Sequence, residues 1–395
     1  MMKRATLLLT TLGLMHGLLA QKGNEFTYES RTQVGYGHDN NVFRSPPEYR
    51  PPNTPPDSLR DPRQKDNFIY FETRQKFQKF FTRKHRFTFV LNGQVLRFSQ
   101  YPEYSEYDFE GQLKYRFKPW KISGFFFSTG VRRAHKRLFN VLGQGLARLF
   151  TFTDLSVAHW QRWRPVKFLV ITPEISFVNR DYVEIPNRMS LDNTRLTVDA
   201  KIQIIPDKNG YHQLFFRPYM QYRDYKGWIV RDSLGNRLPT YPLRKYTYKG
   251  FEAGYQFDMD FLTITLSYYQ EIRRDNFQQW YGYDESGFLA SITYQSNKFV
   301  VSLISAIRNR DWLQKKGYLL DRTKPPLLWK RIKIGGEIVF FPVWWLGTYL
   351  NMTYLSRDTN VEVPFKKVNR PYKALIIHAG VYLRFDTEKK TNKRR

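Results

Sequence analysis

The sequence predicts an all-β chain, folded as a transmembrane antiparallel up-and-down β-barrel of about 16 strands. Aromatic residues make up 17% of the 395 residues, yet the mean hydropathy is −0.58, so the apolar surface is not gathered in long runs. Segments of about ten residues alternate between apolar and polar side chains, as in strands that cross a membrane at a tilt. The connections between these segments alternate between short and long, which is typical of outer-membrane barrels.

The N-terminus predicts export. Lys3 and Arg4 precede an apolar stretch over residues 5–19, and Ala20 offers a small residue for cleavage. This is the pattern of a signal peptide over residues 1–20, which leaves a barrel over residues 21–387. No later stretch has 18 consecutive apolar residues, so helical membrane spans are not expected.

Composition narrows the possible partners. The chain has no cysteine, which excludes disulfides, thiolate metal sites and cysteine nucleophiles. The 64 basic and 35 acidic residues give a formal net charge of +29, but this charge is dispersed along the chain and not gathered in one segment. We therefore expect contact with lipopolysaccharide and lipid of the outer membrane, and no nucleic-acid partner.

The clearest alternation runs from Tyr107 to Phe117. Its odd-numbered residues are aromatic or aliphatic apart from Gly111, whereas its even-numbered residues are polar or charged. The same alternation recurs over residues 195–204, 214–223, 262–269 and 331–340. One face of each segment is expected to meet lipid and the other a wet interior.

Sixteen candidate strands follow from this pattern. They are predicted to begin near residues 26, 66, 84, 105, 121, 148, 166, 192, 211, 243, 261, 284, 298, 329, 345 and 373. Tight links follow the even strands, whereas most links after odd strands are longer, such as those at 39–65, 227–242 and 311–328. In outer-membrane barrels the short turns are periplasmic, so both termini are predicted to lie in the periplasm.

Aromatic residues gather near both ends of the predicted strands, where membrane interfaces would lie. One group lies at the short turns: Phe80, Phe81, Trp120, Trp160, Trp163, Phe257, Phe261, Trp344 and Trp345. The other lies at the long loops: Tyr101, Tyr222, Tyr225, Trp228, Tyr268, Tyr269 and Trp280. We expect two aromatic belts.

Two segments stand apart from the strands. Residues 44–65 hold seven prolines and cannot form a strand or a helix, so we expect an extracellular loop, with a plug inside the barrel as the alternative. Residues 388–395 form a basic tail, which is expected to be periplasmic and solvated.

The last strand resembles the β-signal that the barrel-assembly machinery reads. In that signal a polar residue is followed at fixed spacing by glycine and then by hydrophobic or aromatic residues, which correspond here to His378, Gly380, Leu383 and Phe385. The resemblance implies that this machinery is a partner during biogenesis. The chain departs from the usual form because Phe385 is not the last residue.

The end of the first strand reads Gly35-Tyr36-Gly37-His38-Asp39-Asn40-Asn41-Val42-Phe43. It resembles the opening of many porin-like outer-membrane barrels of Gram-negative bacteria, over about ten residues. Those families are linked to the diffusion or export of solutes and polysaccharides, and some to the delivery of surface proteins. The residues alone predict a turn, because Gly, Asp and Asn tolerate tight backbone.

The wet face supplies the candidate site residues. Its predicted lumen-facing, solute-facing cations are Lys114, Arg116, Arg195, Lys201, Arg217, Arg223, Arg273, Arg331, Lys333 and Arg384. Such cations would enrich anions in a channel. Alternatively, pairing with acidic residues such as Asp199, Glu252 and Glu337 would lock the wall.

No catalytic residue, metal site or cofactor is predicted. Asp39 with Asn40 and Asn41 supplies oxygen ligands, but no second carboxylate follows at a calcium-loop spacing. The leading hypothesis is a passive channel for hydrophilic solutes, anionic or saccharide in type, and not an enzyme. The alternatives are a non-catalytic barrel subunit of an export or protein-assembly complex, and an outer-membrane hydrolase that uses His378.

Overall fold

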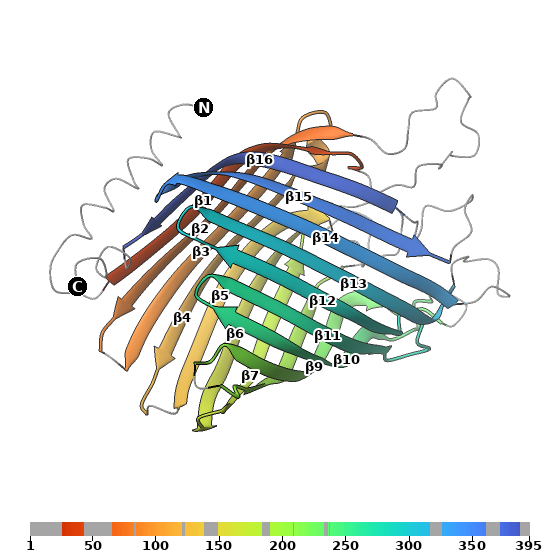
Figure 1. Ribbon diagram of the computed structural model, residues 1–395. Helices are drawn as coiled ribbons and strands as arrows, with labels where there is room; N and C mark the ends of the chain where they lie inside the picture. The colour runs from red at the N-terminus through yellow and green to blue at the C-terminus, as the bar shows by residue number, and fades with distance from the viewer. Residues whose placement is uncertain are drawn as a thin grey trace.

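Sixteen antiparallel strands form one closed barrel in the computed structural model, and each strand pairs with its neighbours in sequence (Figure 1). The structure describes residues 26–42, 65–82, 84–120, 123–137, 149–183, 190–207, 209–232, 236, 238–316, 326–360 and 372–387. The predicted signal peptide, the proline-rich loop apart from Lys65, and the basic tail lie outside these residues. The predicted fold class and strand number are confirmed.

The strands are longer than those of most soluble sheets, as a tilted membrane crossing requires. Their bounds are β1 Phe26–Asp39, β2 Asp66–Phe80, β3 His85–Phe98, β4 Glu106–Phe117, β5 Ser123–Arg137, β6 Leu149–Val166, β7 Leu169–Tyr182 and β8 Asn193–Ile204. The second half comprises β9 His212–Ile229, β10 Leu243–Met259, β11 Leu262–Asp275, β12 Tyr283–Gln295, β13 Phe299–Lys316, β14 Pro326–Val343, β15 Leu346–Thr359 and β16 Tyr372–Asp386. A short 3-10 helix, η2 (Pro102–Tyr104), lies between β3 and β4.

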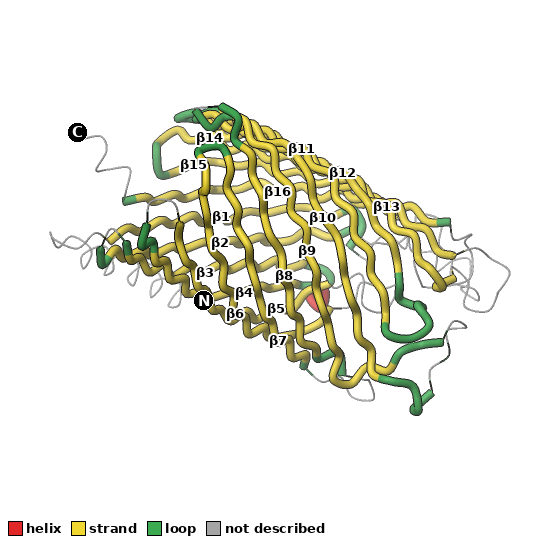
Figure 2. Tube along the Cα trace, turned by 90° about the horizontal axis from the view of Figure 1, so that it is seen from below, coloured by secondary structure: helices red, strands yellow, loops and turns green. Residues whose placement is uncertain are grey.

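The barrel closes where the first strand meets the last. β1 pairs with β16 from Glu29 opposite Asp386 to Asp39 opposite Ile376, and with β2 along its whole length. Closure leaves no free sheet edge, so every strand has a hydrogen-bonding partner on both sides. Figure 2 shows the same strands slanting around the wall, as barrel closure requires.

The connections have the predicted asymmetry. Links after even strands are short, such as residues 167–168, 260–261 and 344–345, whereas β1 and β2 are separated by residues 40–65. All short links lie at one end of the barrel, because consecutive strands run in opposite directions. We call this the turn end, and the other the loop end.

Two strands reach further toward the loop end than predicted. β13 extends to Lys316 and β14 begins at Pro326, so the long connection expected over 311–328 is shorter. The extension is irregular, because the pairing register between these strands shifts between Asp311 and Lys316. A bulge of this kind lets a strand continue where regular pairing has ended.

Side-chain alternation sorts residues onto two faces of the wall. Large apolar residues on one parity are exposed on the outer face, including Val34, Leu91, Phe109, Val157, Phe177, Val198, Phe288, Leu303, Ile338, Met352 and Val381. The opposite parity carries most of the charged residues and faces the interior. An apolar exterior around a polar interior is the reverse of a soluble barrel and is typical of one that spans a membrane.

No helix in the described part of the chain has the length and apolar composition needed to cross a bilayer.

Candidate solute pathway

All ten predicted cations lie on the interior parity of their strands. Lys114 and Arg116 alternate with the exposed Leu113 on β4, and Arg331 and Lys333 alternate with the exposed Ile334 on β14. The others occupy equivalent positions: Arg195 and Lys201 on β8, Arg217 and Arg223 on β9, Arg273 on β11, and Arg384 on β16. Their contact with a solute stays a prediction.

Two of these ten cations form ion pairs within the wall. Arg217 donates from Nε and Nη2 to the two carboxylate oxygens of Asp199, at 3.2 and 2.7 Å. Arg331 Nη2 lies 3.1 Å from Glu285 Oε2. The other eight have no ion pair with any residue that the structure describes. Pairing with acidic residues therefore fixes only a minority of the ten predicted cations in the wall.

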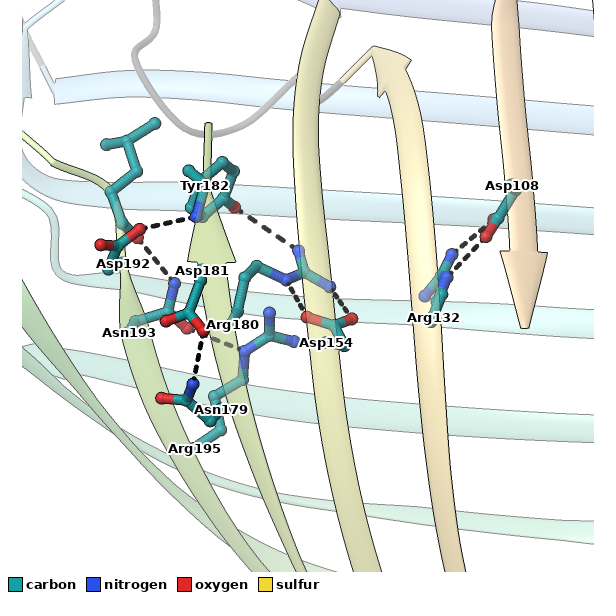
Figure 3. Close-up of polar contacts among 11 residues, drawn as sticks. Asp108, Arg132, Asp154, Asn179, Arg180, Asp181, Tyr182, Asp192, Asn193 and Arg195 are labelled. Carbon is teal, nitrogen blue, oxygen red and sulfur yellow. Dashed lines mark hydrogen bonds and ion pairs between the residues drawn. The ribbon is translucent and has the colours of Figure 1, made fainter. Parts of the chain in front are cut away.

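Further interior ion pairs involve arginines that the sequence did not single out. Arg132 on β5 binds Asp108 on β4 at 2.6 and 2.7 Å, and Arg180 on β7 binds Asp154 on β6 at 2.6 Å from both Nε and Nη2 (Figure 3). Each is a fork-to-fork pair between neighbouring strands, the geometry in which an arginine–carboxylate pair is strongest. Alternation in the sequence does not predict these pairs, because they depend on the register between strands.

Several interior arginines lie directly opposite one another. Arg195 is paired in register with Arg223, and Arg331 is paired with Arg308 on one side and Arg357 on the other. Like charges at directly opposite positions destabilise a sheet. The repulsion falls when an anion or water lies between the guanidinium groups, so these rows are suited to a wet, anion-accessible interior.

Carboxylates also meet in the interior. Glu174 on β7 lies opposite Asp199 on β8, and Glu271 on β11 lies opposite Glu285 on β12. Glu271 accepts hydrogen bonds from the hydroxyls of Tyr219 and Tyr283, at 2.7 Å each. The interior therefore carries carboxylates among its cations and does not have a uniform positive lining.

Part of the interior is open to water. Arg74, Arg308 and Lys333 face inward by parity, yet all three are exposed. None of them forms an ion pair with a described residue. Exposed side chains on the inner face of a closed wall indicate a hydrated space within the barrel.

The expected aromatic belt at the loop end is wrong for four of its seven residues, whereas Tyr268 lies on the same outer parity of β11 as the exposed Leu266. Tyr222 lies on the outer face, but Tyr225, Trp228 and Trp280 are buried within the barrel, and Tyr269 faces inward to donate to Glu285 at 2.9 Å. Trp228 leaves the outer parity because the pairing of β9 with β10 shifts by three residues between Lys245 and Leu243. At the turn end the expectation is better met, since Phe81, Trp120, Trp163, Phe261, Trp344 and Trp345 are exposed.

These buried rings join an interior cluster at the loop end of β9–β14. Arg244 lies at its centre and is fully buried, with its guanidinium carbon 3.3 Å from the ring centre of Trp228 and 3.6 Å from that of Tyr281. Its three guanidinium nitrogens have no hydrogen-bond acceptor among the described residues. Stacking between two rings is thus the stabilising contact of this buried cation.

The link between β11 and β12 is held in place by Asp275. Its carboxylate accepts hydrogen bonds from the backbone N–H groups of Phe277, Gln279 and Tyr281, at 2.8 to 3.0 Å. Gln279 has a φ of 58°, and its side-chain amide donates to the Asp275 carbonyl at 2.7 Å, which supports this strained backbone. The link thereby places Trp280 and Tyr281 inside the barrel.

The four residues of the assembly-signal resemblance split between the two faces. His378 and Gly380 face inward, and Leu383 and Phe385 lie on the outer parity. The His378 ring lies 3.4 Å from the Tyr349 hydroxyl through Nδ1 and packs against Tyr70. No described serine hydroxyl or carboxylate hydrogen-bonds this ring, so no hydrolytic arrangement is visible around it.

Asp39, Asn40 and Asn41 form a turn that ties β1 to β16. Asp39 Oδ1 accepts from the Asn41 backbone N–H at 2.9 Å, Asn40 Oδ1 accepts from Leu375 N–H, and Asn41 Nδ2 donates to the Lys373 carbonyl, both at 2.8 Å. At least one side-chain atom of each residue is thus used in a hydrogen bond within the protein. Over the described ranges, no group of three or more His, Asp or Glu side chains could hold a metal ion.

Solved outer-membrane barrels resemble this chain in structure. It is similar to an anion-selective porin from Comamonas acidovorans (6% identity, 92% of this chain and 100% of that one, TM-score 0.45). It is also similar to OprB from Pseudomonas putida (12%, 95% and 97%, TM-score 0.47) and to the channel DcaP from Acinetobacter baumannii (9%, 93% and 99%, TM-score 0.46). No family model matches the chain, and no curated protein matches it in sequence.

Proposed function

We propose that the chain is a passive channel across the outer membrane for hydrophilic solutes, with a preference for anions. The observation that carries this proposal is a set of inward-facing cations that are exposed and form no ion pair with a described residue, among them Arg74, Arg308 and Lys333. Exposed cations inside a low-dielectric wall raise the local concentration of anions and lower that of cations.

Two further features support the preference. The Arg195–Arg223 and Arg308–Arg331 pairs place positive charges directly opposite each other, where an anion would relieve their repulsion. Sixteen strands give a wall wide enough to leave an aqueous channel unless something fills it. The aromatic and arginine cluster fills part of the loop end, so we expect a narrower pathway there than at the turn end.

Conductance tests the proposal directly. Purified protein in a planar lipid bilayer under a potassium chloride gradient should conduct, with a reversal potential displaced toward that of chloride. A barrel that never conducts at any voltage would overturn the proposal, and a reversal potential on the potassium side would overturn the anion preference.

We further propose that the turn end faces the periplasm, with both termini on that side. Because the chain has no cysteine, single introduced cysteines can report topology without background. Thr240 lies in the β9–β10 connection at the loop end and Asp260 in the β10–β11 turn, and both are exposed. The two variants are Thr240→Cys and Asp260→Cys. A membrane-impermeant maleimide applied to intact cells should label the first variant and not the second, and the opposite result would reverse the orientation.

The two alternative functions have less support. A role as a subunit of an export or assembly complex would use residues 44–65 and 388–395 as contact arms, and the structure describes only Lys65 of these residues. A hydrolase would need a nucleophile or an acid beside His378, whose ring contacts tyrosines and Phe68.

A further inference from the structure

A cavity lies in the inner wall where β14, β15 and β16 meet β1 and β2. Its volume is about 290 Å³, and every side chain that lines it is on the interior parity of its strand. This size is just below the range for small-molecule pockets, roughly 300 to 1,000 Å³. Its occupant would therefore be a small solute taken from the channel.

One side of the cavity presents an unneutralised cation. Arg74 on β2 lies directly opposite Arg31 on β1. Arg31 is neutralised by Glu29, with Nη2 2.6 Å from Oε1. Arg74 is exposed and has no ion pair or side-chain hydrogen bond with a described residue, so its guanidinium fork is available to a carboxylate.

The β14 side presents an unneutralised anion. Glu337 Oε2 receives two long contacts of 3.5 Å, from Gln33 Nε2 and from Asn351 Nδ2. Neither donor is charged, and no lysine or arginine in the described ranges forms an ion pair with Glu337. Its carboxylate can therefore still accept strong hydrogen bonds from a cationic group.

The aromatic residues of the cavity offer little open ring surface. Tyr70 is only 7% exposed, and its hydroxyl donates to Glu72. The Tyr382 ring packs edge-on against Phe341, with ring centres 5.4 Å apart. A sugar ring would thus find few faces to stack on, whereas a ligand with charged groups finds Arg74 on one side and the carboxylates of Glu337 and Glu72, neither in an ion pair with a described residue, around it.

We propose that this cavity binds a small zwitterion that carries both a carboxylate and an ammonium group, such as an amino acid. Arg74 holds the carboxylate, and Glu337 holds the ammonium group, assisted by the neighbouring amides of Gln33 and Asn351. Such a ligand pairs with both Arg74 and Glu337, whereas a simple anion or a neutral polyol leaves Glu337 without a cationic partner. This inference rests on the proposed channel function, because the solute reaches the cavity through the lumen.

Binding can be measured without conductance, by saturation-transfer NMR on the folded full-length barrel in detergent. The probes are L-glutamine, L-glutaminamide, which lacks the carboxylate, and N-acetyl-L-glutamine, which lacks the ammonium group. We expect glutamine to bind about tenfold more tightly than either analogue, the effect of one charge-assisted hydrogen-bonding partner. Arg74→Gln should abolish the advantage over glutaminamide, and Glu337→Gln the advantage over N-acetylglutamine.

Arg162→Gln on β6, an interior-parity cation outside the cavity, is the matched control and should leave all three affinities unchanged. The inference fails if D-glucose binds as tightly as glutamine, or if succinate binds more tightly and only Arg74→Gln weakens it. It also fails if folded protein, verified by its gel mobility before heating, binds no probe. Glutamine binding by a barrel that does not conduct would overturn the channel and leave the zwitterion site standing. Conduction without binding would overturn the site alone.

Discussion

Gly35 on β1 lies directly opposite Gly380 on β16, at the seam where the barrel closes. A Cβ atom at Gly380 would overlap the Val34 carbonyl oxygen, and one at Gly35 would overlap the Tyr349 hydroxyl. The backbones of the first and last strands therefore approach each other more closely here than any residue with a side chain allows. Gly380 is also the glycine of the assembly-signal resemblance. The close approach of the two strands at the seam is a physical reason why this position needs a glycine.

The first prediction concerns this seam. Gly380→Ala should destabilise the barrel by about 1 to 3 kcal/mol, because the new methyl group meets backbone atoms that can move only if the strands separate. The fraction of protein that keeps its folded gel mobility at increasing temperature measures the effect. Gly335→Ala on β14 is the control, because its nearest atoms would lie at 3.5 and 3.7 Å, ordinary contact distances. Equal thermal stability of the two variants would show that the close approach at the seam is unimportant.

The second prediction separates buried from exposed ion pairs. Asp154→Asn should destabilise the barrel by about 3 to 5 kcal/mol, because it leaves Arg180 charged and unpaired where both side chains are at most 10% exposed. Asp181→Asn, on the same strand as Arg180, removes the exposed pair with Lys226 and should cost at most about 1 kcal/mol. Chemical denaturation in detergent micelles gives both values.

A double variant gives a further check on this pair. Asp154→Leu combined with Arg180→Met removes both charges and should recover most of the stability lost in Asp154→Asn. If the double variant were as unstable as Asp154→Asn, the lost stability would come from the missing ion pair itself and not from leaving Arg180 charged and unpaired.

Most of the wall could be predicted from the sequence, because alternation with a period of two residues directly reports which side chains face lipid. The largest differences in strand starts are at β7, which begins at Leu169 against 166, and at β14, which begins at Pro326 against 329. Interior contacts could not be predicted in the same way. The Arg180–Asp154 pair depends on the stagger between β6 and β7, and the inward turn of Trp228 depends on a three-residue register shift, neither of which alternation encodes.

The third prediction concerns the opposed arginines. The double variant Arg195→Gln, Arg223→Gln should lower the ratio of chloride to potassium permeability, by roughly twofold or more, because two interior charges are lost from one place. Reversal potentials in a salt gradient measure this ratio. Arg133→Gln, on the outer parity of β5, should leave the ratio unchanged. An unchanged ratio in the double variant would place the selective region elsewhere in the lumen.

The fourth prediction tests how Arg244 is stabilised between Trp228 and Tyr281. Arg244→Lys should destabilise the loop end more than Arg244→Met does. A lysine ammonium cannot stack as a planar group and would be buried without an acceptor, whereas methionine fills the slot without a polar atom. A desolvated cation–π contact contributes about 2 kcal/mol, which sets the scale of the loss in either variant. Unfolding followed by the fluorescence of the buried tryptophans reports on this region. If the lysine variant proved the more stable of the two, the positive charge itself would be needed at this position, and a carboxylate or a bound anion would have to lie within reach of it.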